Sequence, residues 1–535
     1  MSFKKNMCLI LFLFSINLIS GCTSKEVLNQ DSTVKDLSND IESTEVFAEQ
    51  LTSLDVNYLS NDSFKFKTNL EEDYNEEIVF QNRYTVLEGI PTFRGNHHRN
   101  SPSFGISDIS TKSLSTLWEF RTSSSSWGGG AGWTGQPAII RWPKELREKM
   151  NIKDEFKYKD NLTEAIYASL DGNIYFIDIE TGVETRDKIH IGNPIKGSVS
   201  VDPRGLPLLY VGEGIKEKGS VGFNIYSLID GSHLFELNGN DSFASRNWPA
   251  FDSCAIVNAE SDSVIVGGEN GLLYIIKLNS NYNEEKNIVS INPKTSKYSY
   301  SVPNSKGRLG IENSIATYAN LAYFADNNGV IQCVDLNTLK PVWFVDGYDD
   351  IDATLTLDIV DKVPYVYCGN EVDHQGSKGI VKLKKINGLD GSIVWEKEFA
   401  CESLVGKKAV NGGLMATNIV GKNKLDDLVI FSLARYDGFN KGGIIALDKK
   451  SGDLVWETKI DNYMWSSPVD IYDKGGNGYI IQGDSVGNLH LLDGKSGNIL
   501  NTITLNGNIE SSPAVFENTL VVATRNGTIY GVNIN

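Results

Sequence analysis

With 535 residues, the chain is too long for one compact core unless its architecture is repetitive. Its formal net charge of −18 repels polyanions, so we expect no nucleic-acid partner. The 50 glycines against 14 prolines suit a fold of short strands and tight turns.

The first 22 residues carry a targeting signal. Lys4 and Lys5 precede an apolar stretch at 8–19, which is shorter than the roughly 20 residues that a membrane-spanning helix needs. The sequence ISGC then ends at Cys22 and resembles a bacterial lipobox, in which the Cys is lipidated. The resemblance implies a signal peptide at 1–21 and a lipid anchor on Cys22. The protein would then be extracytoplasmic, on the cell membrane or the outer membrane. An ordinary secretory signal is the alternative.

Residues 22–82 are rich in Asp, Glu, Asn and Ser, with an acidic run at 71–77. They lack strong periodicity, so this segment is predicted to be a flexible acidic tether that lifts the domain at 83–535 off the membrane.

The rest of the chain repeats one pattern. Residues 443–468 predict a strand, a turn at Ser451-Gly452, a second strand with Trp456, and a loop that ends in Ser-Ser-Pro; the same order recurs at 488–513. Further strand pairs are predicted to begin near Ile166, Leu208, Val264, Leu321, Tyr365, Leu428, Tyr479 and Leu520. Tryptophans recur at matching places in the outer strands, which indicates packing between sheets: Trp118, Trp343, Trp395 and Trp456.

The two ends of the chain are predicted to complete one unit together. Leu520–Ala523 and Thr528–Ile534 supply two strands, while Leu117–Arg121 and Ala138–Arg141 supply an outer and an inner strand. Seven internal units and this composite give an all-β, eight-bladed β-propeller closed by N- and C-terminal strands.

The pattern ALDKKSGDLVW at Ala446–Trp456 resembles the repeats of the pyrroloquinoline-quinone-like propeller superfamily, as does Phe-Arg-Gly-Asn at 93–96. The resemblance covers about residues 89–535. It implies the fold more than a function, because the superfamily holds quinoprotein alcohol dehydrogenases, a lipoprotein scaffold of outer-membrane protein assembly, and anchored lipoproteins without assigned activity. His97 and His98 follow this motif and are expected to be exposed loop residues rather than metal ligands.

Aligning the units on the entry to each inner strand gives a predicted ring at the mouth of the central channel. Its members are Thr134, Lys196, Arg246, Glu312, Asp352, Asn411, Trp465 and Glu510. Lys196 and Arg246 would form a basic side and Glu312 and Asp352 an acidic side. Such a funnel could hold a zwitterionic or polar ligand, with Trp465 or Trp133 as a stacking surface. The alternative is a wet channel lined by polar groups without a ligand.

The sequence bears on two cofactors. The resemblance to quinoprotein dehydrogenases implies pyrroloquinoline quinone (PQQ) and calcium near Glu312, Asp352 and Asn411, but vicinal cysteines and CxxCH are absent. Asp346, Asp349 and Asp350 are weak calcium candidates at short spacing. Cys254, Cys333, Cys368 and Cys401 have no metal-site spacing and leave their disulfide state open.

The sequence therefore predicts a membrane-anchored binding or scaffold module for a protein or a small polar ligand. One alternative is a quinone- or calcium-dependent oxidoreductase. Another is a glycan- or cell-wall-binding protein that uses Trp133, Trp248 and Trp465.

Overall fold

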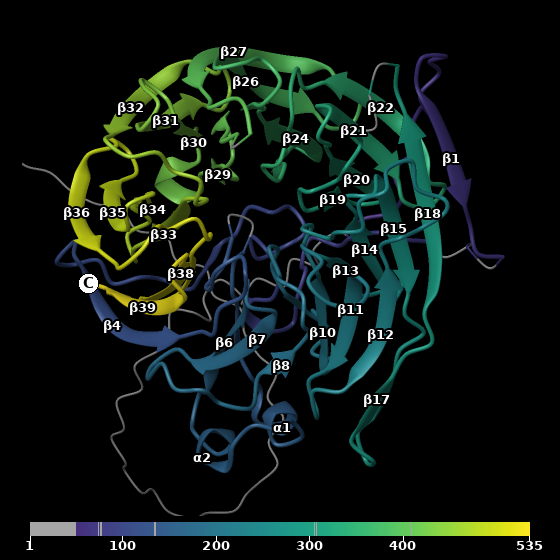
Figure 1. The fold of residues 1–535 in the computed structure, drawn as a ribbon, viewed down its shortest axis with the longest axis vertical. Coiled ribbons are helices and arrows are strands. Elements are labelled where there is room, and N and C mark those ends of the chain that lie inside the picture. The colour runs from purple at the N-terminus through teal and green to yellow at the C-terminus, as the bar shows by residue number, and fades with distance from the viewer. Residues whose placement is uncertain are drawn as a thin grey trace, which may run out of the picture. The chain divides into compact units, whose positions relative to one another are not determined.

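The computed structural model describes residues 50–535 except 73, 75, 76, 133, 134, 304, 306, 307 and 408. Gln50–Asn535 form one unit in which eight antiparallel sheets stand around a central axis as the blades of a propeller (Figure 1). The predicted eight-bladed, all-β fold is confirmed. No helix among the described residues is long and apolar enough to cross a bilayer.

Each blade has four main strands, which follow one another from the channel outward. Blade 1 has β5 (Ala138–Arg141), β6 (Thr163–Ala168), β7 (Asn173–Asp178) and β8 (Ile189–His190), with β2 (Glu88–Ile90) beside β5. Blade 2 has β9 (Ser200–Val201), β10 (Leu208–Gly212), β11 (Gly222–Ser227) and β12 (His233–Asn238). Blade 3 has β13 (Ile256–Asn258), β14 (Ser263–Gly267), β15 (Leu272–Lys277) and β18 (Lys294–Ser301). Blade 4 has β19 (Ala316–Tyr318), β20 (Leu321–Phe324), β21 (Val330–Asp335) and β22 (Lys340–Asp346).

The second half of the ring follows the same order. Blade 5 has β23 (Thr356–Val360), β24 (Val363–Cys368), β26 (Lys378–Asn387) and β27 (Ile393–Glu402). Blade 6 has β29 (Ile419–Val420), β30 (Leu428–Ala434), β31 (Gly442–Asp448) and β32 (Leu454–Ile460), and β28 (Gly412–Gly413) links it to β25 (Glu371–Val372). Blade 7 has β33 (Val469–Tyr472), β34 (Gly478–Gly483), β35 (Asn488–Asp493) and β36 (Ile499–Thr504). Outside the blades lie the hairpin β16 (Asn281–Asn283) and β17 (Ile288–Ser290) and the short helices α1 (Lys144–Arg147), α2 (Asp154–Lys157) and η1 (Asn423–Leu425).

Blade 8 closes the ring with both ends of the described chain. It joins β37 (Ala514–Phe516), β38 (Thr519–Thr524) and β39 (Thr528–Ile534) to β4 (Leu114–Arg121), and β3 (Ser103–Phe104) lies beside β37. The expected outer strand is therefore confirmed, but the expected inner strand is wrong. Ala138–Arg141 starts blade 1, because the C-terminal segment supplies its own inner strand, β37.

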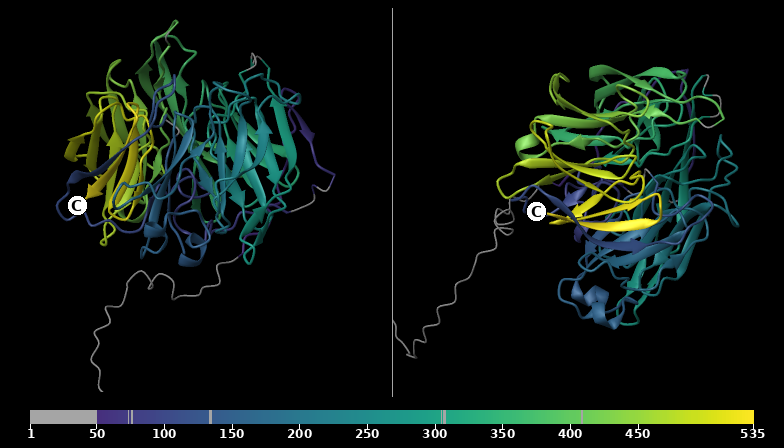
Figure 2. Two further views of the ribbon diagram at one scale, coloured as in Figure 1. Left: turned by 60° about the horizontal axis from the view of Figure 1, so that its bottom comes forward. Right: turned by 60° about the vertical axis from the view of Figure 1, so that its left-hand side comes forward.

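Residues 50–82 were predicted to belong to the flexible tether, but they pack on the propeller. β1 (Lys65–Asn69) pairs with β18 and adds a fifth strand to the outside of blade 3 (Figure 2). Leu54 donates its backbone N–H to Asn320 Oδ1 at 2.7 Å, and Phe64 is buried between blades 3 and 4. This segment therefore packs on the propeller despite its polar composition, because a few apolar residues suffice to bind it to blades that are already folded. The predicted signal peptide and residues 22–49 lie outside the described residues.

Tryptophans lock neighbouring blades together, as the sequence predicts. Trp118, Trp343, Trp395 and Trp456 are buried, and each donates its indole N–H to a backbone carbonyl of the next blade at 2.7–3.1 Å. The turn that receives the ring needs glycine. A Cβ on Gly452 would meet the Trp395 ring at 2.8 Å, and its φ of 72° is also unfavourable for other residues.

A belt of hydrogen bonds links the entries to the inner strands around the channel. In each of these bonds, a backbone N–H of one blade donates to a side-chain hydroxyl of the next blade at 2.8–3.4 Å. The six pairs are Gln136 to Ser198, Cys254 to Ser314, Ser314 to Thr354, Thr354 to Thr417, Thr417 to Ser467, and Ser467 to Ser512. Ser512 N–H donates to the Gly135 carbonyl at 2.9 Å and joins blade 8 to blade 1. We call this set the hydroxyl belt.

The segment around Phe-Arg-Gly-Asn crosses the inner strands and binds several blades at once. Arg94 is fully buried and donates to the carbonyls of Pro468 and Asn418, while Arg99 donates to those of Ile315 and Cys254. The expectation of exposed histidines is wrong. His97 is buried and the ring of His98 lies 4.1 Å from it, and burial lowers the pKa of His98 to about 4.

The hydroxyl belt can be tested at Thr354. Thr354→Val keeps the shape of the side chain but leaves the buried Ser314 N–H without an acceptor, so we expect it to lower the free energy of unfolding by about 1–3 kcal/mol. Thr354→Ser keeps the hydroxyl and should cost less than about 1 kcal/mol, the value of one methyl group. Equal losses for the two variants in urea unfolding would show that the hydroxyl does not matter.

Candidate functional site at the channel mouth

Most predicted ring residues occupy equivalent positions. Lys196, Glu312, Asp352, Trp465 and Glu510 each lie four residues before the inner strand of their blade. Arg246 and Asn411 do not, because longer loops precede β13 and β29; the equivalent residues are Asp252 and Met415. The belt hydroxyl Thr417 lies two residues after Met415. This spacing is the sequence signal that could have given the correct alignment of this blade. Thr134 and Trp133 lie outside the described residues.

The predicted basic side of the funnel is wrong, because both basic residues are engaged by polar groups of other blades. Lys196 Nζ forms an ion pair with Asp252 and lies 3.5 Å from Glu269 Oε1. Arg246 Nη1 donates to Asn327 Oδ1 at 2.6 Å. Lys196 and Arg246 therefore do not form a basic side that is separate from the acidic side.

Contacts at the predicted acidic side involve more carboxyl groups than Glu312 and Asp352. Asn327 Nδ2 donates to Glu312 Oε1 at 2.9 Å and to Asp350 Oδ1 at 3.3 Å. Asn411 Nδ2 donates to Glu371 Oε2 at 3.1 Å, so this misaligned residue still reaches the cluster. We call the following set the carboxylate cluster: Asp252, Glu269, Glu312, Asp350, Asp352 and Glu371.

The carboxylate cluster carries more negative charge than its surroundings neutralise. Burial, followed by the charges of Asp352 and Asp350, raises the pKa of Glu371 well above its usual range. Burial and the nearby Glu312 do the same to the pKa of Asp352. Asp352 Oδ1 and Glu371 Oε1 are buried and accept from no N–H or hydroxyl group in the described part of the chain, and the two carboxyl groups hydrogen-bond each other. Two such oxygens need a proton or another cation beside them.

The remaining described ring members, Trp465 and Glu510, contact residues outside the carboxylate cluster. Trp465 packs against Tyr463, with ring centroids 5.6 Å apart. Glu510 Oε2 lies 3.3 Å from Arg525 Nε, and its Oε1 accepts from Asn508. Trp248 is 48% exposed, and no contact joins it to Trp465 among the described residues.

The three calcium candidates have three different roles. Asp346 accepts from the backbone N–H of Tyr348, and Asp349 accepts from those of Asp373 and His374. Asp350 belongs to the carboxylate cluster. A calcium site formed by these three residues stays a prediction. The disulfide state that the sequence left open is that of free thiols: Cys254, Cys333, Cys368 and Cys401 are free and buried.

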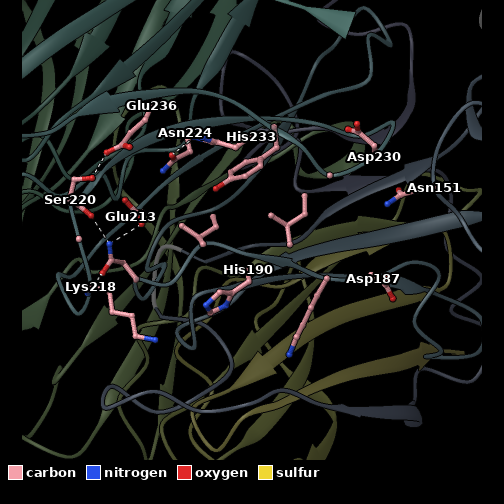
Figure 3. Close-up of a pocket in the computed structure, with 17 residues that line it drawn as sticks. Asn151, Asp187, His190, Glu213, Lys218, Ser220, Asn224, Asp230, His233 and Glu236 are labelled. Carbon is pink, nitrogen blue, oxygen red and sulfur yellow. Dashed lines mark hydrogen bonds between the residues drawn. The ribbon is translucent and has the colours of Figure 1, made fainter. Parts of the chain in front are cut away.

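Sequence reasoning missed a cavity of about 680 Å³ between blades 1 and 2 (Figure 3). It opens where the outer strand of blade 1, β8, has only two residues. Arg186 stands there in place of the recurring tryptophan and donates to the Leu228 carbonyl at 3.0 Å. The walls carry polar groups such as His190 and His233, each hydrogen-bonded to an asparagine.

Comparison with known proteins agrees with this architecture. Residues 440–535 match a family model described as "Outer membrane protein assembly factor BamB". Within that match lies the repeat at Ala446–Trp456, so the resemblance noted in the sequence is supported for the last blades of the propeller. The structure is similar to a quinohemoprotein alcohol dehydrogenase from Comamonas testosteroni, with 13% identity, a TM-score of 0.55, and coverage of 84% of this chain and 80% of that one.

Two further structures extend the comparison. BamB from Moraxella catarrhalis has 17% identity and a TM-score of 0.47, with 78% of this chain and 99% of that one covered. The dehydrogenase ADHIIG from Pseudomonas putida HK5 has 11% identity and a TM-score of 0.55, with 84% and 80% covered. No curated protein matches the chain. At such identities the likeness concerns the fold, so function has to be argued from the site.

The residues at the channel mouth do not fit PQQ. PQQ is a tricarboxylate, and it would face a carboxylate cluster in which Lys196 is already paired with Asp252. Asn411 binds Glu371, and no contact joins it to Glu312 or Asp352 within the described residues. A calcium ion without PQQ would be attracted by the carboxylate cluster and not repelled by it.

The charge excess can be tested with Glu371→Gln. A raised native pKa means that the folded protein binds more protons than the unfolded chain, so Glu371 destabilises the fold increasingly as pH rises above about 4.5. Glutamine removes the charge and can donate to Asp352 Oδ1. We expect the variant to be more stable than the wild type by about 1–3 kcal/mol at pH 7.5, with a smaller gain at pH 5. Urea unfolding at both pH values measures this; a loss of stability at pH 7.5 would contradict it.

Proposed function

We propose that the protein is a non-catalytic binding propeller, held outside the cytoplasm by a lipid on Cys22. The acidic side of its channel mouth receives a cationic group of a protein or a small polar ligand. The observation that carries this proposal is the carboxylate cluster, in which the buried carboxyl groups of Asp352 and Glu371 hydrogen-bond each other, while Asp352 Oδ1 and Glu371 Oε1 accept from no N–H or hydroxyl group of the described residues.

The physical argument is one of compensation. Six carboxylates from three successive blades meet one buried lysine and one partly exposed arginine, so a cation that enters relieves repulsion among groups that the fold already holds in place. Glu312 is only partly buried and offers the entry point. Preorganised charge of one sign favours binding because little side-chain entropy is lost.

A scaffold role for a protein partner has separate support. The family that matches residues 440–535 is described as an outer membrane protein assembly factor, which is consistent with a surface that holds another protein. Blades joined by tryptophans and by the hydroxyl belt form a rigid platform, as such a role requires.

The binding proposal is tested by thermal unfolding with 1 mM spermidine as the cationic probe. We expect the wild-type midpoint to rise by about 1–3 °C at pH 7.5, because the ligand binds only the folded state. Glu312→Gln should lose most of this shift. Sodium chloride at matched ionic strength and citrate serve as controls. An equal shift with citrate, or an unchanged shift in Glu312→Gln, would contradict a cation site at the mouth.

The anchor is tested by detergent-phase partitioning of cells that express the full chain. We expect the wild type in the detergent phase and Cys22→Ser in the aqueous phase, because only a thiol can carry the lipid. Cys8→Ser removes a thiol from the segment that is predicted to be cleaved, so it should partition like the wild type. Detergent-phase recovery of Cys22→Ser would rule out lipidation at this residue.

A further inference from the structure

We propose that Asp350, Asp373 and His374 form a binding site for a divalent transition-metal ion such as Zn²⁺. The site goes beyond the function proposed above, because two of its ligands lie on the loop between β24 and β26 of blade 5, outside the carboxylate cluster, with which it shares only Asp350.

The three side chains present their ligand atoms to one point. One carboxylate oxygen from each aspartate and one imidazole nitrogen all lie within 4.8 Å of one another. His374 Nδ1 is 2.7 Å from Asp373 Oδ2. Asp350 is buried, whereas the side chains of Asp373 and His374 are 26% and 33% exposed. The group therefore has a fixed inner ligand and an open outer side through which an ion can enter.

The donor set indicates which kind of ion fits. Zn²⁺ binds imidazole nitrogen and carboxylate oxygen at about 2.0–2.2 Å, and three protein ligands leave a position for water. Calcium and magnesium prefer oxygen alone, so an imidazole among three ligands favours a borderline transition-metal ion over either.

The loop that carries two of the ligands is already ordered by a neighbouring blade connection. Asp349 accepts hydrogen bonds from the backbone N–H groups of Asp373 at 3.0 Å and His374 at 3.1 Å, and from Gln375 Nε2 at 2.9 Å. Asp349 precedes Asp350, so one short segment supplies both the inner ligand and the support for the other two. Such supporting contacts orient ligands in metal sites and tune their affinity.

A further buried carboxyl group lies close to Asp350. Glu371, two residues before Asp373, is fully buried, and its carboxyl group hydrogen-bonds that of Asp352. Its charged neighbours are Asp352 and Asp350, which are both carboxylates. A divalent ion bound through Asp350 would therefore lower the negative charge of these surroundings.

The test is calorimetric titration of the full, metal-stripped chain with Zn²⁺, together with the visible spectrum of bound Co²⁺. We expect about one ion per chain. His374→Ala and Asp373→Asn should weaken binding at least about 100-fold, and Asp349→Asn about 10–100-fold through the position of the loop. His233→Ala, which removes an exposed imidazole on blade 2, is the matched control and should change neither the affinity nor the Co²⁺ spectrum.

The outcomes separate this site from the channel mouth. Glu312→Gln should leave Zn²⁺ binding within a few-fold of the wild type while it removes most of the spermidine shift. Loss of Zn²⁺ binding in His374→Ala with the spermidine shift retained supports two sites. The metal proposal is overturned if Zn²⁺ does not bind or if His374→Ala binds it as the wild type does. Calcium that binds more tightly than Zn²⁺ and is indifferent to His374→Ala would equally overturn it.

Discussion

The hydroxyl belt is the constraint on which the channel mouth depends. Six of the eight inner strands are entered through a residue whose backbone N–H donates to a hydroxyl of the next blade, and the chain there has little room. A Cβ on Gly197, for example, would meet the carbonyl oxygen of Asp252 at 2.4 Å. The residues just before these small ones therefore have no freedom to splay apart, and their side chains must meet at the mouth whatever charge they carry.

The hydroxyl belt brings the negatively charged side chains of the carboxylate cluster close together. Lys196, Asp252, Glu312 and Asp352 come from four successive blades at equivalent positions, and Glu269 and Glu371 approach from turns between strands of blade 3 and blade 5. Five buried carboxylates and the partly buried Glu312 around one paired lysine contribute nothing to the stability of the fold. Their convergence in a rigid ring is the basis for proposing that the mouth receives a cation.

The repeat made the fold predictable, and it made part of the site predictable. Trp456 and its equivalents, the composite blade and the ring positions of Glu312 and Asp352 all follow from a pattern that recurs with one spacing. Arg246 and Asn411 were misplaced where loops of unusual length interrupt the repeat. Glu371 and His374 could not be foreseen, because they lie on an insertion whose path is fixed by contacts with Asp349 and not by the repeat. The prediction from composition was wrong for residues 50–82. Their few apolar side chains pack against the blades and not against each other.

The central claim is that the carboxylate cluster exchanges protons for a cationic ligand. Burial, opposed by Lys196, raises the pKa of Asp252 to about 6, so part of the cluster should be protonated at pH 6. The most direct measurement is calorimetry of spermidine binding at pH 6 in two buffers of different ionisation enthalpy. The account predicts a binding heat that differs between the buffers and reports protons released by the protein. Binding with the same heat in both buffers would contradict it.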